Sequence, residues 1–126
     1  MDIIKQVKMV RQAAVYATYQ QNWGGESENA LDPECVENVK RLLDGMGDEL
    51  AHEVQVGDMG ITSNGTVDFD IGSPDLYFFI DVGTTSMLFY CRAPDGLYGK
   101  DVNVPFTDQA IAELNALYLE WKKMCA

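Results

Sequence analysis

The stretch Gly65–Arg92, which reads GTVDFDIGSPDLYFFIDVGTTSMLFYCR, determines the fold that the sequence predicts. It contains three short segments that are rich in β-branched and aromatic residues, and the first of them alternates strictly between apolar and polar side chains. Residues typical of turns separate the segments. We therefore predict an antiparallel meander with strands at 66–71, 76–82 and 87–91.

The turns between these strands predict their register. A loop at 72–75 and a two-residue loop at 83–84 place Phe69 opposite Phe78, and Phe78 opposite Phe89. One face of the sheet is then apolar in every row. This agreement supports the pairing, because a shift by one residue would turn every side chain to the other face.

The second face of the predicted sheet combines aromatic side chains with carboxylates. The expected rows are Asp70–Tyr77–Tyr90 and Asp68–Phe79–Leu88, with Asp81 nearby. An exposed face of this kind offers aromatic contact area and selects a basic partner. The alternative is that another element of the chain covers it. The candidate partner-binding residues are Asp68, Asp70, Tyr77, Phe79, Asp81 and Tyr90.

The charge distribution indicates the kind of partner. The net charge is −11, and the segment Leu42–Cys91 contains nine acidic residues but no lysine or arginine. Such a chain repels phosphates, so we expect no direct contact with nucleic acid. The expected partner is a protein with a basic surface.

Length and composition indicate a protein with its own core. The chain has 126 residues, of which 47% are hydrophobic, so we expect one domain spanning 1–126. No segment approaches the roughly 18 apolar residues of a membrane span, and the N-terminus has no signal-peptide pattern. The cysteines Cys35, Cys91 and Cys125 are far apart and odd in number. They suggest reduced thiols and a cytoplasmic location.

Helices are expected before and after the meander in the sequence. The first covers residues 2–21, with a core stripe formed by Ile3, Val7, Val10, Ala14 and Ala17. Asp32 and Pro33 then begin a helix that runs to about Gly45, and Thr107 caps a final helix.

Further strands are expected at 59–62 and, more weakly, at 97–104. Ser63-Asn64-Gly65 forms a three-residue loop that places Ile61 opposite Val67. The predicted fold is therefore α+β, with two N-terminal helices, an antiparallel meander sheet of four or five strands, and a C-terminal helix packed on one face.

Signatures of catalysis, cofactor binding or metal binding are missing from the sequence. There is no phosphate loop, no Cys-x-x-Cys and no Gly-x-Ser-x-Gly. His52 is the only histidine, so we expect it to be a surface or capping residue and not a metal ligand. The Asp68-x-Asp70 pattern lacks the remaining ligands of a calcium loop. Asp68 and Asp81 could act as an acid–base pair, but an open sheet face would not exclude water. We expect no enzyme, cofactor or metal.

Several residues together resemble a known family. Asn22-Trp23-Gly24-Gly25-Glu26, then Pro33 at a helix start, then Asn64–Asp68 at the start of a sheet, are similar to a loose family of small uncharacterised α+β proteins from bacteria and mobile elements. That family has an Asn-Trp-x-Gly loop, and more often an aspartate where this chain has Gly24. The resemblance spans roughly residues 20–122. It implies the same architecture and no activity.

Three functions are consistent with the sequence. The first is a non-enzymatic interaction protein of phage or mobile-element origin, such as an inhibitor or antitoxin-like protein that engages a basic protein surface. The second is a homodimeric structural or scaffold protein that uses the aromatic sheet face. The third is a small-ligand binder near Trp23, although Trp23 in a loop more often packs against its own helices.

Overall fold

The computed structural model describes the backbone of residues 1–126 and the side chains of residues 1–100 and 102–126. The helices are α1 (Ile3–Tyr16), α2 (Pro33–Gly45), α3 (Asp48–Glu53) and α4 (Asp108–Met124), with a short 3-10 helix η1 (Val56–Asp58). The strands are β1 (Met59–Ile61), β2 (Val67–Gly72), β3 (Tyr77–Val82), β4 (Ser86–Ala93) and β5 (Gly96–Pro105). The predicted α+β class is confirmed, and α3, η1 and the full length of β5 are additions.

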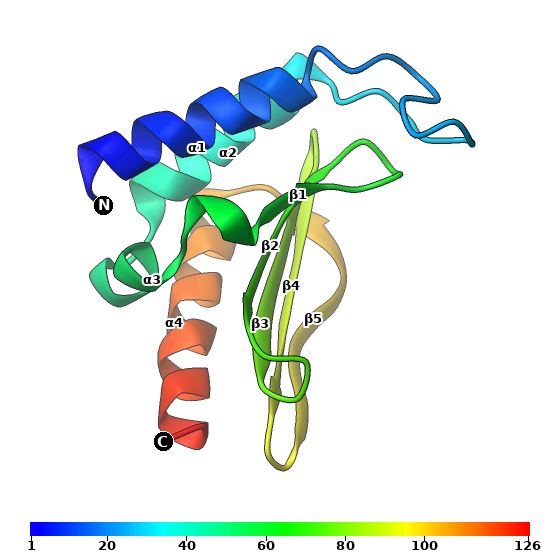
Figure 1. The fold of residues 1–126 in the computed structure, drawn as a ribbon. Coiled ribbons are helices and arrows are strands. Elements are labelled where there is room, and N and C mark those ends of the chain that lie inside the picture. Colours follow the sequence, from blue (N-terminus) through cyan, green and yellow to red (C-terminus); the bar gives the residue numbers. More distant parts are fainter.

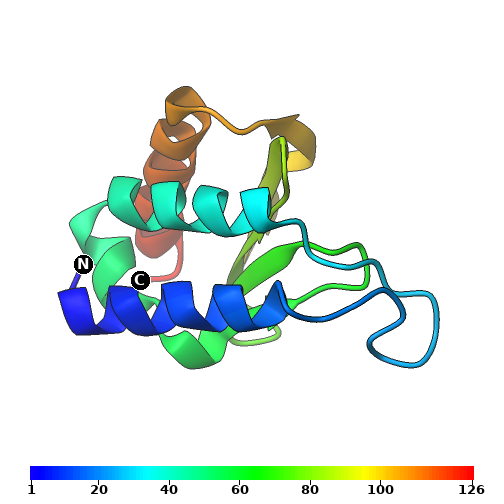
Figure 2. The same ribbon diagram turned by 90° about the horizontal axis from the view of Figure 1, so that it is seen from above.

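The five strands form one antiparallel sheet in the order β1-β2-β3-β4-β5. Helix α4 lies along one face of this sheet, and we call that side the core face (Figure 1). Helices α1 and α2 run side by side across the upper ends of the strands (Figures 1 and 2). No helix of the described chain lies over the other side, which we call the open face (Figure 1).

The core face follows from strict alternation along the strands. In β2 and β4, every second residue is buried against the helices. Phe78 of β3 is fully buried, and its ring contacts those of Tyr118 and Trp121 on α4, at centroid distances of 5.5 and 5.7 Å. These aromatic contacts fix α4 on the sheet.

Both predicted hairpin registers are wrong by two residues. Phe69 lies opposite Ile80, and Phe78 lies opposite Cys91. The faces of the sheet are nevertheless as predicted, because a shift of two residues keeps each side chain on its side. In the first hairpin the turn begins one residue later, at Ser73, whose backbone N–H donates to the carbonyl of Leu76.

The loop of the second hairpin has the same length as the first, and the backbone N–H of Gly83 donates to the carbonyl of Ser86 at 2.8 Å. Four residues, 83–86, separate the paired residues Val82 and Met87. The buried Asn38 of α2 donates from its amide nitrogen to the carbonyls of Gly83 and Thr84, at 2.9 and 2.7 Å. These two bonds anchor the loop to α2.

Replacing Asn38 by alanine is expected to lower the free energy of unfolding by about 2 kcal/mol, because it removes both hydrogen bonds from a buried loop. Urea unfolding followed by circular dichroism measures the change. Glu37→Ala, at an exposed site on the same helix, is the control and should stay within about 0.5 kcal/mol of the parent. Equal effects of the two changes would show that Asn38 does not secure the loop.

The first helix differs from its prediction in length and orientation. Helix α1 ends at Tyr16 rather than near residue 21, and Asp2 caps its N-terminus by accepting from the backbone N–H of Ile4 at 2.8 Å. Met9 and Ala13 are its buried residues, whereas Ile3, Val7 and Ala14 of the predicted stripe are exposed. Apolar residues occupy both sides of this helix, so their periodicity did not distinguish the buried side.

Three other local predictions are confirmed. Asp32 accepts from the N–H of Glu34 at the start of α2, and Thr107 accepts from the N–H of Ala110 at the start of α4. Ile61 pairs with Val67 across a loop in which Gly65 has a φ of 77°. In the described part of the chain, we find no helix with both the length and the apolar character needed to cross a membrane.

Candidate partner-binding face

The candidate partner-binding residues all lie on the open face, but in rows that differ from the predicted ones. Asp70 of β2, Phe79 of β3 and Tyr90 of β4 form the central row. Asp68, Asp81 and Leu88 form the adjacent row, nearer to α1. Tyr77 lies in the next row on the opposite side, where it pairs with Gly72. The shift of two residues in both hairpins explains why the observed rows differ from the predicted ones.

The aromatic side chains of the open face form one cluster. The ring centroid of Tyr90 lies 5.2 Å from that of Phe79 and 6.1 Å from that of Tyr77. All three side chains are half-buried. Because each ring supports the others, the cluster offers a broad apolar surface whose side chains lose little freedom when a partner binds.

Two shallow hollows adjoin this cluster, and Tyr77 and Tyr90 line both of them. The first has a volume of about 480 Å³ and includes the side chains of Asp58, Asp70 and Phe79. The second has a volume of about 400 Å³ and adjoins β5, where Leu97 is exposed. One hollow therefore offers carboxylates beside aromatic rings, and the other is lined by tyrosines and Leu97 with no carboxylate.

Asp58 was not among the residues predicted for this face. It belongs to η1, where its side chain accepts from the backbone N–H of Gln55 at 2.8 Å. Because η1 leads directly into the edge strand β1, it brings Asp58 to the rim of the first hollow. The only sequence pattern that pointed to this position was the run of acidic residues between Leu42 and Cys91.

The carboxylates of Asp68 and Asp81 lie opposite each other on neighbouring strands and are half-buried. One oxygen of Asp81 is buried without a hydrogen-bond partner among the described residues. Burial raises the pKa of Asp81, and the Thr66 side chain partly opposes this. Burial, followed by the charges of Asp81 and Asp70, raises the pKa of Asp68. The sequence placed this pair on a fully solvated surface, and the structure corrects that expectation.

Asp81→Asn is expected to raise the free energy of unfolding at pH 7 by about 1 kcal/mol, because it removes a poorly solvated charge. The folded-state pKa of Asp81 lies above the unfolded value, so the stability that the aspartate contributes is present at low pH and is lost as pH rises through the raised pKa. The gain should therefore be small at pH 3. Urea unfolding at pH 3 and pH 7 measures both values.

Asp75→Asn is the control, since Asp75 is exposed in the β2–β3 turn. It should change the stability by less than about 0.5 kcal/mol at either pH. A gain from Asp81→Asn that is as large at pH 3 as at pH 7 would contradict the assignment of a buried charge.

Basic residues are scarce on the open face. Within the described side chains of the two rows that contain Asp68 and Asp70, none is basic. Arg92, further along β4, is exposed and pairs with Leu97 of β5. The centre of the face is therefore acidic, and one arginine lies at its far end.

Trp23 lies in the loop between α1 and α2 and is half-buried. Its indole N–H donates to the carbonyl of Asn29 at 3.0 Å, and its ring lies 5.9 Å from that of Tyr19. Glu28 accepts from the backbone N–H groups of Gly24 and Glu26 in the same loop. These contacts use Trp23 to hold its own loop, and they do not favour a ligand-binding role for it.

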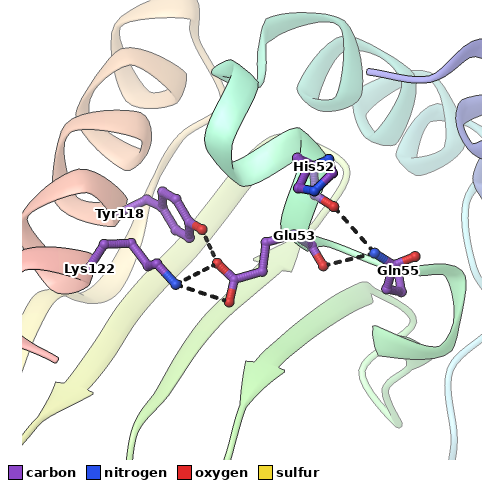
Figure 3. A network of polar contacts seen from close by, with 5 residues as sticks. All are labelled: His52, Glu53, Gln55, Tyr118 and Lys122. Carbon is purple, nitrogen blue, oxygen red and sulfur yellow. Dashed lines mark hydrogen bonds and ion pairs between the residues drawn. The ribbon is translucent and has the colours of Figure 1, made fainter. Parts of the chain in front are cut away.

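A second polar cluster joins α3 to α4 (Figure 3). The hydroxyl of Tyr118 donates to Glu53, and the ammonium group of Lys122 lies 3.2 Å from the same carboxylate. Gln55 donates to the carbonyls of His52 and Glu53. His52 is exposed at the end of α3 and contributes its backbone here, so this cluster is a structural link between the two helices.

The described side chains contain no group of three or more His, Cys, Asp or Glu residues arranged to hold a metal ion. The three cysteines are free, and Cys35 and Cys91 are buried. Burial raises the pKa of both thiols to about 11, which leaves them as inert core residues. Comparison of the chain with protein-family models, with curated proteins and with solved structures found no match.

Proposed function

We propose that this chain is a non-enzymatic interaction protein that binds a basic protein surface through the open face of its sheet. The observation that carries the proposal is the combination of acidic and aromatic side chains on one uncovered face. Asp68, Asp70 and Asp81 stand beside the cluster formed by Phe79 and Tyr90. Such a surface provides both contact area and selection for positive charge.

The two hollows suggest which side chains of a partner the open face recognises. An arginine or lysine entering the first hollow meets the carboxylates of Asp58 and Asp70 and the rings of Phe79 and Tyr90. Ion pairing and cation–π contact then act on the same group. An apolar side chain next to it fits the second hollow, against Leu97 and Tyr77. The preferred partner therefore presents a basic residue beside an apolar one.

An inhibitor or antitoxin-like role would follow from this chemistry. Proteins that act on nucleic acids carry basic surfaces, and an acidic protein that covers such a surface blocks access to phosphates. This role rests on the acidic centre of the open face and on the net charge of −11.

Affinity capture from the cells that encode the chain tests the proposal. The wild-type chain is expected to retain a basic protein in 0.05 M salt and to release most of it in 0.5 M salt, because screening weakens the charge contacts. Asp70→Lys should lose the partner, and Glu37→Lys, an equal change of charge on the outside of α2, should keep it. Retention by Asp70→Lys at the wild-type level, or retention that does not depend on salt, would overturn the proposal.

A further inference from the structure

The outward side of α1 is apolar, which is unusual for a surface helix of a strongly acidic protein. Four large side chains on it are exposed: Ile3 (75%), Ile4 (66%), Val7 (43%) and Val15 (48%). They lie opposite the buried residues Met9 and Ala13. We call this surface, together with Lys8 and Arg11, the outer face of α1. Several large apolar side chains exposed on one side of a helix indicate a contact with another molecule.

The outer face of α1 is also basic. Lys8 and Arg11 are exposed and lie between Ile4 and Val15 at helical spacing. Helix α1 holds three of the nine basic residues of the chain and none of its 20 acidic ones. Within the described residues, neither Lys8 nor Arg11 makes an ion pair. The occupant of this face is therefore expected to be acidic as well as apolar.

The open face of the sheet has that chemistry. It offers the carboxylates of Asp58 and Asp70 beside the rings of Tyr77 and Tyr90. We propose that the outer face of α1 in one copy of the chain docks on the open face of a second copy. This inference rests on the proposed function of the open face, and it identifies one basic, apolar surface that the face would accept.

Charge distinguishes this pairing from the two symmetric ones. Two copies of α1 packed against each other would bring Lys8 and Arg11, near the middle of the helix, close to the same residues of the second copy. Two open faces packed together would oppose Asp70 to the acidic residues of the other copy. Both arrangements set like charges against each other. The contact between α1 and the open face joins opposite charges and buries apolar surface on both sides.

The two faces lie on different parts of the molecule. Helix α1 crosses the upper ends of the strands, whereas the open face is the side of the sheet away from α4 (Figure 1). The contact is therefore head-to-tail, since each copy binds one neighbour through the outer face of α1 and another neighbour through the open face. A head-to-tail contact continues beyond two copies, so the average mass should rise steadily with concentration.

Analytical ultracentrifugation with complementary variants tests this inference. The measurement uses the full chain in about 0.15 M salt, where the Debye length of about 8 Å screens the net charge beyond the contact. Variant one carries Lys8→Glu and Arg11→Glu and has no basic outer face on α1. Variant two carries Asp70→Lys on the open face. Both sites are exposed, and circular dichroism checks that each variant is folded.

The wild-type chain is expected to exceed its monomer mass of 14.0 kDa between 10 and 200 μM, roughly the range in which such contacts form. Each variant alone should remain at the monomer mass. An equimolar mixture should form a dimer, because variant one retains the open face and variant two retains α1. Lys40→Glu with Lys123→Glu, which changes the net charge as variant one does, should still assemble.

Three results would overturn the inference: a wild-type chain that stays at 14.0 kDa at 200 μM (about the upper limit of the assay), either variant assembling as the wild type does, or a mixture that remains monomeric. These results separate it from the proposed function. If the wild type stays monomeric while Asp70→Lys still abolishes capture of a basic protein, the open face keeps its function and the second copy is excluded as its occupant.

Discussion

Phe78→Ala is expected to lower the free energy of unfolding by about 4 kcal/mol, whereas Phe79→Ala, at the next residue, should cost about 1 kcal/mol. Phe78 is fully buried between the sheet and α4, where it contacts Tyr118 and Trp121. Phe79 is half-buried on the open face, where it packs beside Tyr90 and lines the first hollow. Truncation at position 78 therefore leaves a cavity, and truncation at position 79 does not.

Urea unfolding of the two variants measures this difference directly. The pair is its own control, because the same side chain is truncated in the same strand. Similar losses at both positions would mean that the open face is covered in solution, and a larger loss at Phe79 would reverse the assignment of the two faces. Either outcome would remove the basis of the binding proposal.

Tyr90→Ala is expected to weaken binding of the captured basic partner by about 30-fold, which corresponds to about 2 kcal/mol. Tyr90 lines both hollows and contacts Phe79 and Tyr77, so it lies at the centre of the proposed contact. A central aromatic residue that becomes buried on binding typically contributes more than charges at the rim.

Isothermal titration calorimetry with the purified partner measures this loss. Leu119→Ala is the control: Leu119 is a large exposed side chain on α4, away from the open face. We expect it to leave the dissociation constant unchanged within a factor of about two. A Tyr90→Ala variant that binds as tightly as the control would exclude the aromatic cluster from the interface.

The sidedness of the sheet could be predicted from the sequence, and the register could not. Alternation in β2, β3 and β4 assigns each side chain to a face regardless of how long the hairpin loops are. Register depends on the loops, and the second loop is bonded to Asn38, which lies 45 residues before Gly83 in the chain. Patterns within the strands carry no information about a contact of that kind.

Helix α1 shows a second limit of sequence patterns. The helix was predicted, but its apolar residues surround most of its circumference, so two different stripes fit the same period. The structure buries Met9 and Ala13 and leaves Ile3 and Ile4 outside. The stripe chosen from the sequence belongs in part to the surface that we now propose as an interface. An excess of apolar residues on a helix that has few neighbours can thus indicate a binding surface.

The candidate face itself was only partly predictable. Its aspartates and aromatic residues were assigned correctly to one side of the sheet. That assignment needs only the alternation of side chains along each strand, which a shift of two residues does not change. The pairing of Asp68 with Asp81, their burial and the arrival of Asp58 from η1 depend on how distant segments pack. Those features determine the electrostatics of the face, and no pattern within a single strand specifies them.

Site-specific photocrosslinking shows directly whether the open face contacts the partner. A photoreactive benzoylphenylalanine takes the place of Tyr77 on the open face in one variant and of Leu119 on α4 in another, and each is irradiated with the captured basic partner. We predict a crosslinked product from position 77 that Asp70→Lys abolishes, and little or none from position 119. Crosslinking from position 119 with none from position 77 would contradict the claim that the open face binds the partner.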